Sequence, residues 1–450
     1  MAGTIRDPYP DALRACALLV VVLGHWIATL PRLVDGQLAD TDHLLAVWDA
    51  AGYLTWLVQV VPLFVFVSAA VSVEGVERRV QAGGQARWWA GRALGLARPA
   101  VTYLAALVAL AALSFVTGGR LLGVFNQSLT IHLWFLLMLL TVQALLPWCL
   151  RLDARLGLGA VAALVGVAAL LDVARAGAWS PSALRWLGRD VAAHPAGIAW
   201  LNMLVVWLVP QQLGIAWKRG RFRGAGSGLA LLALGAAWLL LALASGYPVA
   251  MVGVALAGNN MLPPTLALVG VMWLQAGAVL LFEPLARRLL AGRALGRVIA
   301  VLGALGMPLY LWHKLAELPA AWLGEWLGLP IDAGLPGEPG FWLGRAGWIA
   351  LCLLMVAPVI AVVLRFELSR DREVPAVEAT GRILVGGIAL YLGLAAALVW
   401  GVWPGAVVAL PAVLLASWQL RRGGVDTAPD ADTNTNTNTD ADADADADAA

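Results

Sequence analysis

The sequence predicts an all-α polytopic membrane protein with about twelve transmembrane helices and a disordered C-terminal tail. Three observations lead to this prediction: the composition, the recurrence of long apolar runs, and the uneven distribution of basic residues among the loops. The chain is 61% hydrophobic and 13% charged, and its mean hydropathy is +0.80. A soluble domain of this length has a far more polar composition.

Twelve apolar runs are long enough to cross about 30 Å of hydrocarbon. The first follows a short charged lead and has full length, which is not the pattern of a cleaved signal peptide. In chain order the runs cover residues 12–31, 52–73, 99–116, 131–150, 158–174, 199–217, 229–245, 262–282, 298–316, 341–364, 383–401 and 403–419.

The basic residues sort by loop when the loops are assigned alternately to the two sides of the membrane. The chain has 30 Lys and Arg, and most of them fall in the even-numbered loops and at the two ends. By the positive-inside rule this side is cytoplasmic, so both termini are predicted inside the cell and the protein in the plasma membrane. The basic excess therefore indicates topology rather than binding to nucleic acid.

The last residues differ from the rest of the chain. Residues 421–450 are a low-complexity stretch, rich in Asp, Ala, Thr and Asn, that ends in DADADADADAA. Such a stretch cannot bury apolar surface, so we expect it to be a disordered, acidic, solvated tail.

Arg14 and His25 lie inside the first apolar run. Eleven helical positions add about 1100°, so both side chains share one helix face and lie about 16 Å apart along the axis. Asp11 lies one turn before Arg14. Ionisable residues within a membrane span are costly and are functional candidates by default.

Two more histidines are predicted at a depth similar to that of His25. His132 begins the fourth run, and His313 lies near the outer end of the ninth, close to Lys314 and Glu317. Zinc binding by the three histidines has no support beyond their similar depth, so no metal site is predicted. The remaining histidines, His43 and His194, fall in outer loops, where we expect them to be solvated.

Several motifs, taken in order and spacing, resemble the acyltransferase-3 family of integral membrane O-acyltransferases, and most closely its actinobacterial type. They include YPDALRACALLVVVLGHW, VVPLFVFVSAAV, HLWFLLMLL, NMLVVWLVPQQLGIAWKRGR and MPLYLWHKL. The resemblance implies a ten-helix acyltransferase-3-like membrane domain over residues 1–365. Residues 366–420 then form two additional transmembrane helices, before the tail at 421–450.

The resemblance makes His25 the leading catalytic residue and Arg14 its companion. A neutral imidazole can take the proton of an acceptor hydroxyl that attacks a thioester, and a covalent acyl-His intermediate is an open alternative. Arg14 stays protonated, so it either holds a carboxylate such as Asp11 or meets the donor. His132 and His313 are expected to support the site on the acceptor side.

The resemblance also implies a cytoplasmic acyl-CoA donor, acetyl-CoA by default, and no permanently bound cofactor. The basic segment between the second and third runs offers Arg87, Arg92 and Arg98 for the donor, although positive-inside topology alone also explains them. Many relatives have a tight Arg-x-x-Arg here, and the wider spacing leaves the donor-binding residues open. The acceptor is expected to be a hydroxyl of an envelope glycan, a lipid or a natural product, and membrane lipids surround the protein.

Two other classes of function remain open. Twelve spans with both ends inside also suit a secondary transporter, but residues 1–220 and 230–420 show no repeat of the kind such transporters often have. A catalytically inactive relative that binds an envelope lipid is the third alternative. Labelled acyl-CoA distinguishes the three classes of function. An acyltransferase turns it over, a transporter moves it across the membrane, and an inactive relative only binds it.

Overall fold

The computed structural model describes residues 7–82, 84–119, 122–175, 197–253, 258–332, 334–368 and 380–421, and the structural statements below concern these residues. The predicted tail and His194 lie outside them. The first half contains α1 (Pro8–Ala28), β1 (Thr29–Val34), β2 (Gln37–His43), α2 (Leu44–Val47), α3 (Ala51–Val58), α4 (Val61–Gln81), α5 (Gln85–Val116), η1 (Gly123–Phe125), α6 (Ser128–Ile131), α7 (Trp134–Ala144), α8 (Leu146–Leu156) and α9 (Gly159–Arg175). The second half contains η2 (Gly197–Leu201), α11 (Asn202–Lys218), α12 (Gly224–Ala244), α13 (Ala267–Leu290), α14 (Arg293–Trp326), α15 (Phe341–Leu368), α16 (Thr380–Trp400), η3 (Gly401–Ala406) and α17 (Val407–Arg421).

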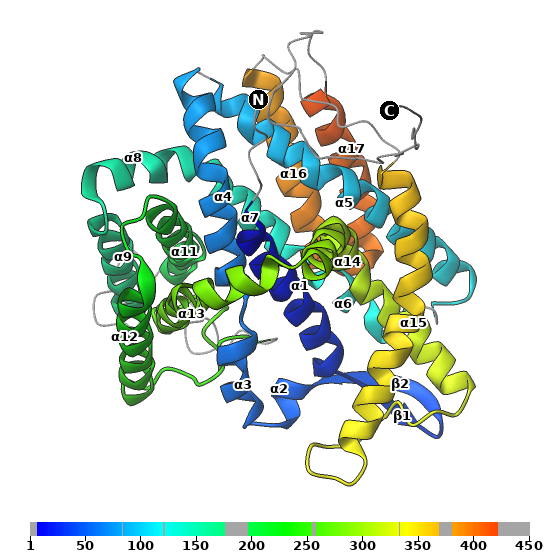
Figure 1. The fold of residues 1–450 in the computed structure, drawn as a ribbon. Helices are drawn as coiled ribbons and strands as arrows, with labels where there is room; N and C mark the ends of the chain where they lie inside the picture. Colours follow the sequence, from blue (N-terminus) through cyan, green and yellow to red (C-terminus); the bar gives the residue numbers. More distant parts are fainter. Residues whose placement is uncertain are drawn as a thin grey trace, which may run out of the picture.

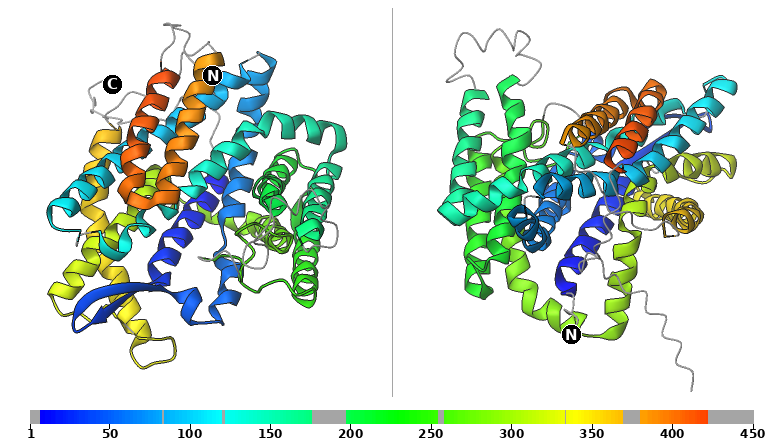
Figure 2. Two further views of the ribbon diagram at one scale, coloured as in Figure 1. Left: turned by 180° about the vertical axis from the view of Figure 1, so that it is seen from behind. Right: turned by 90° about the horizontal axis from the view of Figure 1, so that it is seen from above.

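The all-α polytopic fold is confirmed, and the number of spans needs one adjustment. Ten helical stretches in the described part of the chain are long and apolar enough to cross a membrane, and the bent pair α8–α9 makes eleven. This total of eleven is one below the predicted twelve, because Thr380–Arg421 is counted as one apolar stretch although it contains two of the predicted runs. Within it, α16 and α17 lie side by side as an antiparallel pair, so the two predicted runs are two helices (Figure 2).

Helix α1 lies between two groups of helices (Figure 1). Its second half, with Leu18, Val22 and Trp26, belongs to a hydrophobic cluster formed largely with α5, α14, α15, α16 and α17. Its first turns, with Tyr9 and Ala15, belong to a second cluster formed with α4, α11 and α13. Helix α1 therefore packs against different helices along its length, and its most extensive contact is with α14.

Close approach of α4 and α11 depends on Gly214. A Cβ atom at this position would overlap the backbone carbonyl of Phe66, so any larger residue would force the two helices apart. Packing through small residues is the usual way in which membrane helices gain contact area, because lipid supplies no hydrophobic force to drive them together.

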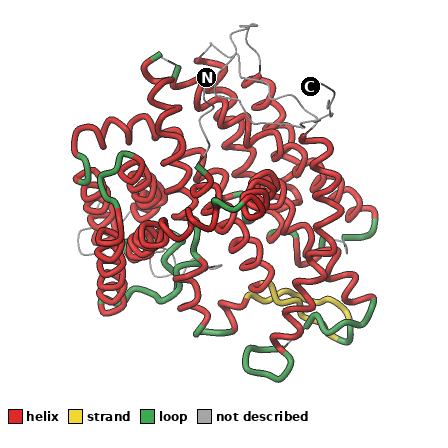
Figure 3. The backbone as a smooth tube through the Cα atoms, in the orientation of Figure 1, coloured by secondary structure: helices red, strands yellow, loops and turns green. Residues whose placement is uncertain are grey.

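A β-hairpin follows α1 directly and was not predicted. β1 and β2 pair antiparallel, from Thr29 opposite His43 to Val34 opposite Gln37, at one end of the molecule (Figure 3). Both residues of its turn, Asp35 and Gly36, have positive φ, 51° and 76°. An Asp-Gly pair is the preferred sequence for such two-residue hairpin turns, so the signal for this element was present in the sequence.

The loops predicted on the same side meet one another in the structure. At one end Arg219 pairs with Glu77 and with Asp153, and Arg287 lies 2.6 Å from Asp7. At the other end Asp172 accepts hydrogen bonds from the Tyr247 hydroxyl (3.0 Å) and the Leu266 N–H (2.6 Å).

These two groups of contacts connect the ends of seven helices, namely α1, α4, α8, α11 and α13 in the first group and α9, α12 and α13 in the second. Both groups agree with the alternation of loops that the basic residues predict.

Candidate functional site

His25 of α1 and His313 of α14 are in direct contact. The His25 Nδ1 atom lies 2.7 Å from the His313 Nε2 atom, and the two rings stack with centroids 5.0 Å apart and planes 8° from parallel. The sequence predicted only a similar depth for these residues. Because α1 packs on α14, the two side chains at similar depth come close enough to form a hydrogen bond.

A backbone carbonyl determines how the two rings share their protons. The His313 Nδ1 atom lies 2.7 Å from the carbonyl oxygen of Tyr310, which can only accept a hydrogen bond. The His313 Nδ1 therefore holds the ring proton, and its Nε2 is an acceptor for the His25 Nδ1–H. In this neutral arrangement the lone pair of the remaining nitrogen, His25 Nε2, takes no part in the contact with His313.

His132 packs against this pair through its ring. Its centroid lies 5.4 Å from that of His313 and 5.5 Å from those of Tyr103 and Tyr310. The side chain is 2% exposed, and neither ring nitrogen has a hydrogen-bond partner in the structure. Buried polar nitrogens are normally paired, so the unpaired imidazole beside His313 is a candidate position for a polar ligand. The three histidines predicted at one depth thus form one cluster.

A buried ion pair lies one turn beyond His313. Lys314 Nζ is 2.6 Å from the Oε2 atom of Glu317 and donates to the hydroxyl of Thr29 at 3.3 Å. Thr29 in turn donates to the His25 carbonyl, and the Trp26 indole N–H donates to the His313 carbonyl at 3.0 Å. Sequence analysis placed Lys314 and Glu317 near the outer surface but gave them no role. Opposite charges three residues apart inside an apolar helix were the available signal.

Arg345 is a second residue that the sequence did not identify. It lies near the start of the tenth predicted run, and in the structure it belongs to α15 with 2% of its surface exposed. Its guanidinium donates to the carbonyls of Thr29 (2.6 Å) and Ile331 (2.8 Å) and lies over the Trp348 ring. It therefore joins the start of β1 to the segment after α14, next to the histidine cluster.

His43 was predicted to be solvated, and this was wrong. It lies at the end of β2, where its Nδ1 caps α2 by accepting the Leu45 N–H at 3.2 Å. Burial, assisted by the nearby Lys314 ammonium, lowers the pKa of His43 to about 4. The cap needs a neutral imidazole, because a protonated ring cannot accept the Leu45 N–H.

Arg14 and Asp11 form the predicted ion pair, with the Arg14 Nη1 atom 3.3 Å from Asp11 Oδ1. Because α1 is continuous from Pro8 to Ala28, Arg14 remains about 16 Å along the axis from His25. The structure thus places the Arg14–Asp11 pair on the same helix as the histidine cluster but not in contact with it.

The three donor candidates lie on a helix rather than in a loop. α5 begins at Gln85, well before the predicted start at 99, so Arg87, Arg92 and Arg98 all have helical positions. At about 100° per residue, Arg87 and Arg98 share a face, whereas Arg92 points about 140° away from Arg87. Arg92 donates to the Ser72 hydroxyl at 3.0 Å and lies over the ring of Trp88. The three side chains do not converge on one point.

Within the described residues no group of three or more His, Cys, Asp or Glu is arranged to hold a metal ion. Separately, the ring nitrogens of His25 and His313 contact each other and a backbone carbonyl, an arrangement that suits proton transfer.

Comparison with known families decides between the acyltransferase and the transporter classes that the sequence left open. The sequence profile of the acyltransferase domain that defines the acyltransferase-3 family matches residues 7–364. The chain belongs to the acyltransferase-3 family. It is thus a multi-pass membrane acyltransferase, which separates it from the transporter alternative, and α16 and α17 lie beyond the matched residues. Neither the curated proteins nor the solved structures contain a match.

Proposed function

We propose that this acyltransferase moves an acyl group, acetyl in the simplest case, from cytoplasmic acyl-CoA to a hydroxyl of an envelope glycan, a lipid or a natural product. It does so in the plasma membrane with both termini in the cytoplasm. Membership of the family supports acyl transfer, and the basic residues of the even-numbered loops support this orientation.

His25 is the general base in this proposal. The chain of contacts from the Tyr310 carbonyl through His313 to His25 leaves the lone pair of His25 Nε2 available. An imidazole held in one tautomer by a second group is the arrangement that a general base requires, because orientation decides which nitrogen meets the substrate. This chain of contacts is the single observation on which the proposal depends.

The transfer step balances without a further reactant. The proton of the acceptor hydroxyl moves to His25 Nε2 as the oxygen forms a bond to the thioester carbonyl carbon. The carbon–sulfur bond then breaks, and the CoA sulfur takes the proton back from His25. During the step the positively charged ring keeps its Nδ1–H on His313 Nε2. The unpaired nitrogens of His132 are placed to bind the acceptor.

Replacing His25 by Ala tests the base. General base catalysis contributes about 10²–10⁴-fold, so we expect a loss of at least about 100-fold in transfer of radiolabelled acetyl from acetyl-CoA. His43→Asn, which keeps a capping side chain outside the cluster, is the control for folding and insertion. Activity of His25→Ala at the level of this control would disprove the proposal. Covalent label that wild-type protein retains after rapid quenching, that is lost in acid or hydroxylamine and that is absent from His25→Ala would instead indicate an acyl-His intermediate.

The donor arginines are tested separately. A charged hydrogen bond to phosphate is worth about 1.5–3 kcal/mol, so loss of a contacting arginine should raise the KM for acetyl-CoA about tenfold or more. We expect this for Arg87→Gln and Arg98→Gln, which share a face of α5, and a smaller effect for Arg92→Gln, which faces Ser72. Arg155→Gln, an exposed arginine on α8, is the matched control. An unchanged KM in all of them would reduce these arginines to determinants of topology.

A further inference from the structure

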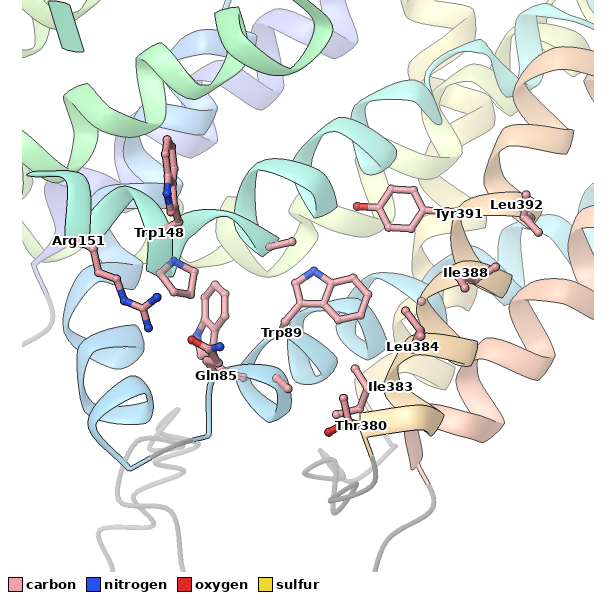
Figure 4. Close-up of a pocket in the computed structure, with 15 residues that line it drawn as sticks. Gln85, Trp89, Trp148, Arg151, Thr380, Ile383, Leu384, Ile388, Tyr391 and Leu392 are labelled. Atoms are coloured by element: carbon pink, nitrogen blue, oxygen red, sulfur yellow. The ribbon is translucent and has the colours of Figure 1, made fainter. Parts of the chain in front are cut away.

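A cavity of about 590 Å³ lies apart from the histidine cluster, between the first turns of α5, the junction of α7 and α8, and α16 (Figure 4). Its volume falls within the range of about 300–1,000 Å³ that is usual for small-molecule sites. Trp88, Trp89, Trp148 and Tyr391 contribute aromatic walls, and most of the remaining lining is aliphatic. None of the residues proposed for catalysis or for the donor lines it.

The walls of this cavity are fixed by contacts outside it. The Trp89 indole N–H donates to the Leu140 carbonyl at 3.3 Å, and the Tyr391 hydroxyl lies 2.9 Å from the hydroxyl of Thr141. On α16, Gly387 lets the helix approach the Trp89 ring, because a Cβ there would lie only 2.9 Å from it. Two of the aromatic walls, Trp89 and Tyr391, are therefore held in place by contacts within the protein.

The opening of the cavity carries a single cation among its lining residues. Arg151 and Trp148 lie at one end, whereas Tyr391 and Leu392 lie at the other (Figure 4). Arg151 is exposed and makes no ion pair within the described part of the chain. It lies at the end of the molecule where the basic loops gather. A cation at the rim of an apolar cavity, close to the end of membrane helices, complements an amphiphile with an anionic head.

We propose that the cavity binds an anionic phospholipid, with one acyl chain between Trp89 and α16 and the phosphate beside Arg151. Basic pockets between membrane helices are known to bind such headgroups, and a cation near the membrane surface attracts them with about 1 kcal/mol. The apolar walls supply the contact area for the chain, and Arg151 supplies the preference for negative charge.

This lipid site is separate from the transfer site and lies where the matched domain meets α16. Trp89 lies fourteen residues before Tyr103, which is about 21 Å along α5, and Tyr103 contacts the histidine cluster. One wall of the cavity is α16, which lies beyond the residues matched by the family profile. A lipid in the cavity therefore lies at the seam between the acyltransferase domain and the additional helix pair.

Native mass spectrometry of the full-length protein in detergent tests the proposal, with phosphatidylglycerol or phosphatidylcholine of the same chains as the probe. We expect one retained lipid and an apparent Kd about fivefold lower for phosphatidylglycerol. Arg151→Gln should remove this preference, whereas Arg155→Gln, on the same helix but outside the cavity, should keep it. Equal effects of the two variants overturn the proposal.

A second pair of variants tests the cavity itself. Leu384→Trp places a larger side chain into the cavity, and Val385→Trp places the same side chain beside it, both at exposed positions of α16. Only Leu384→Trp should lose the retained lipid, and undiminished retention in this variant overturns the proposal. Displacement of phosphatidylglycerol by palmitoyl-CoA at a lower concentration than by added phospholipid would assign the cavity to the acyl donor and also overturn it. If Leu384→Trp does not fold, the comparison of Arg151 and Arg155 decides alone.

Discussion

The contact between His25 and His313 makes a quantitative prediction about paired substitutions. His25→Ala removes the base and should cost about 10²–10⁴-fold in activity. His313→Ala removes only the acceptor that holds the His25 Nδ1–H at 2.7 Å. One buried hydrogen bond is worth about 1–3 kcal/mol, which corresponds to about 5- to 150-fold. Since His313 acts through His25, the double variant should be no slower than His25→Ala alone.

The assay is transfer of radiolabelled acetyl from acetyl-CoA into membrane-bound acceptor, with the amount of inserted protein measured in the same membranes. His313→Gln offers a side-chain oxygen near the former Nε2 atom and should recover part of the activity that His313→Ala loses. Multiplicative losses in the double variant would show that the two histidines act independently, and would refute a relay through His313. A purely structural role for His313 predicts no recovery by Gln.

Three further predictions follow from individual contacts. His132→Phe keeps the ring contacts and removes two unpaired buried nitrogens. The melting temperature should therefore stay the same or rise, while the KM for the acceptor increases. A lower melting temperature with an unchanged KM would contradict this. Glu317→Gln leaves the Lys314 ammonium unpaired and should destabilise the protein by about 3–5 kcal/mol. The double variant Lys314→Met, Glu317→Leu removes both charges and should cost much less. Equal melting temperatures for the two variants would refute a buried ion pair. The folded-state pKa of His43, about 4, lies below its ordinary value of 6.5, so stability should be complete above pH 6.5 and fall as the pH drops towards 4, and His43→Asn should flatten this slope in thermal unfolding.

The membrane helices could be predicted from the sequence because length and hydropathy alone determine whether a segment can cross the bilayer. The start of α5 was predicted too late for the same reason: Arg87, Trp88 and Arg92 lower the hydropathy, but arginine is a good helix former, so the helix continues beyond its apolar part. Hydropathy predicts where a chain can lie in lipid and not where its helices end.

The candidate site could be predicted in part. The depths of His25, His132 and His313 follow from their positions in apolar runs, but their contacts depend on how α1, the C-terminal end of α6 and α14 pack, which a single sequence does not reveal. The Tyr310 carbonyl that sets the tautomer of His313 is a backbone atom and has no sequence signature. Arg345 is hidden for the same reason, because its partners are two backbone carbonyls.

The two ion pairs Asp11–Arg14 and Lys314–Glu317 share a spacing of three residues within one helix. Each cation therefore has its counterion one turn away before any other part of the protein is present. During biosynthesis the charges of these two pairs in α1 and α14 can therefore be neutralised within each helix, without waiting for a partner helix to supply the opposite charge. Neither pair thus imposes an order of assembly on the two helices.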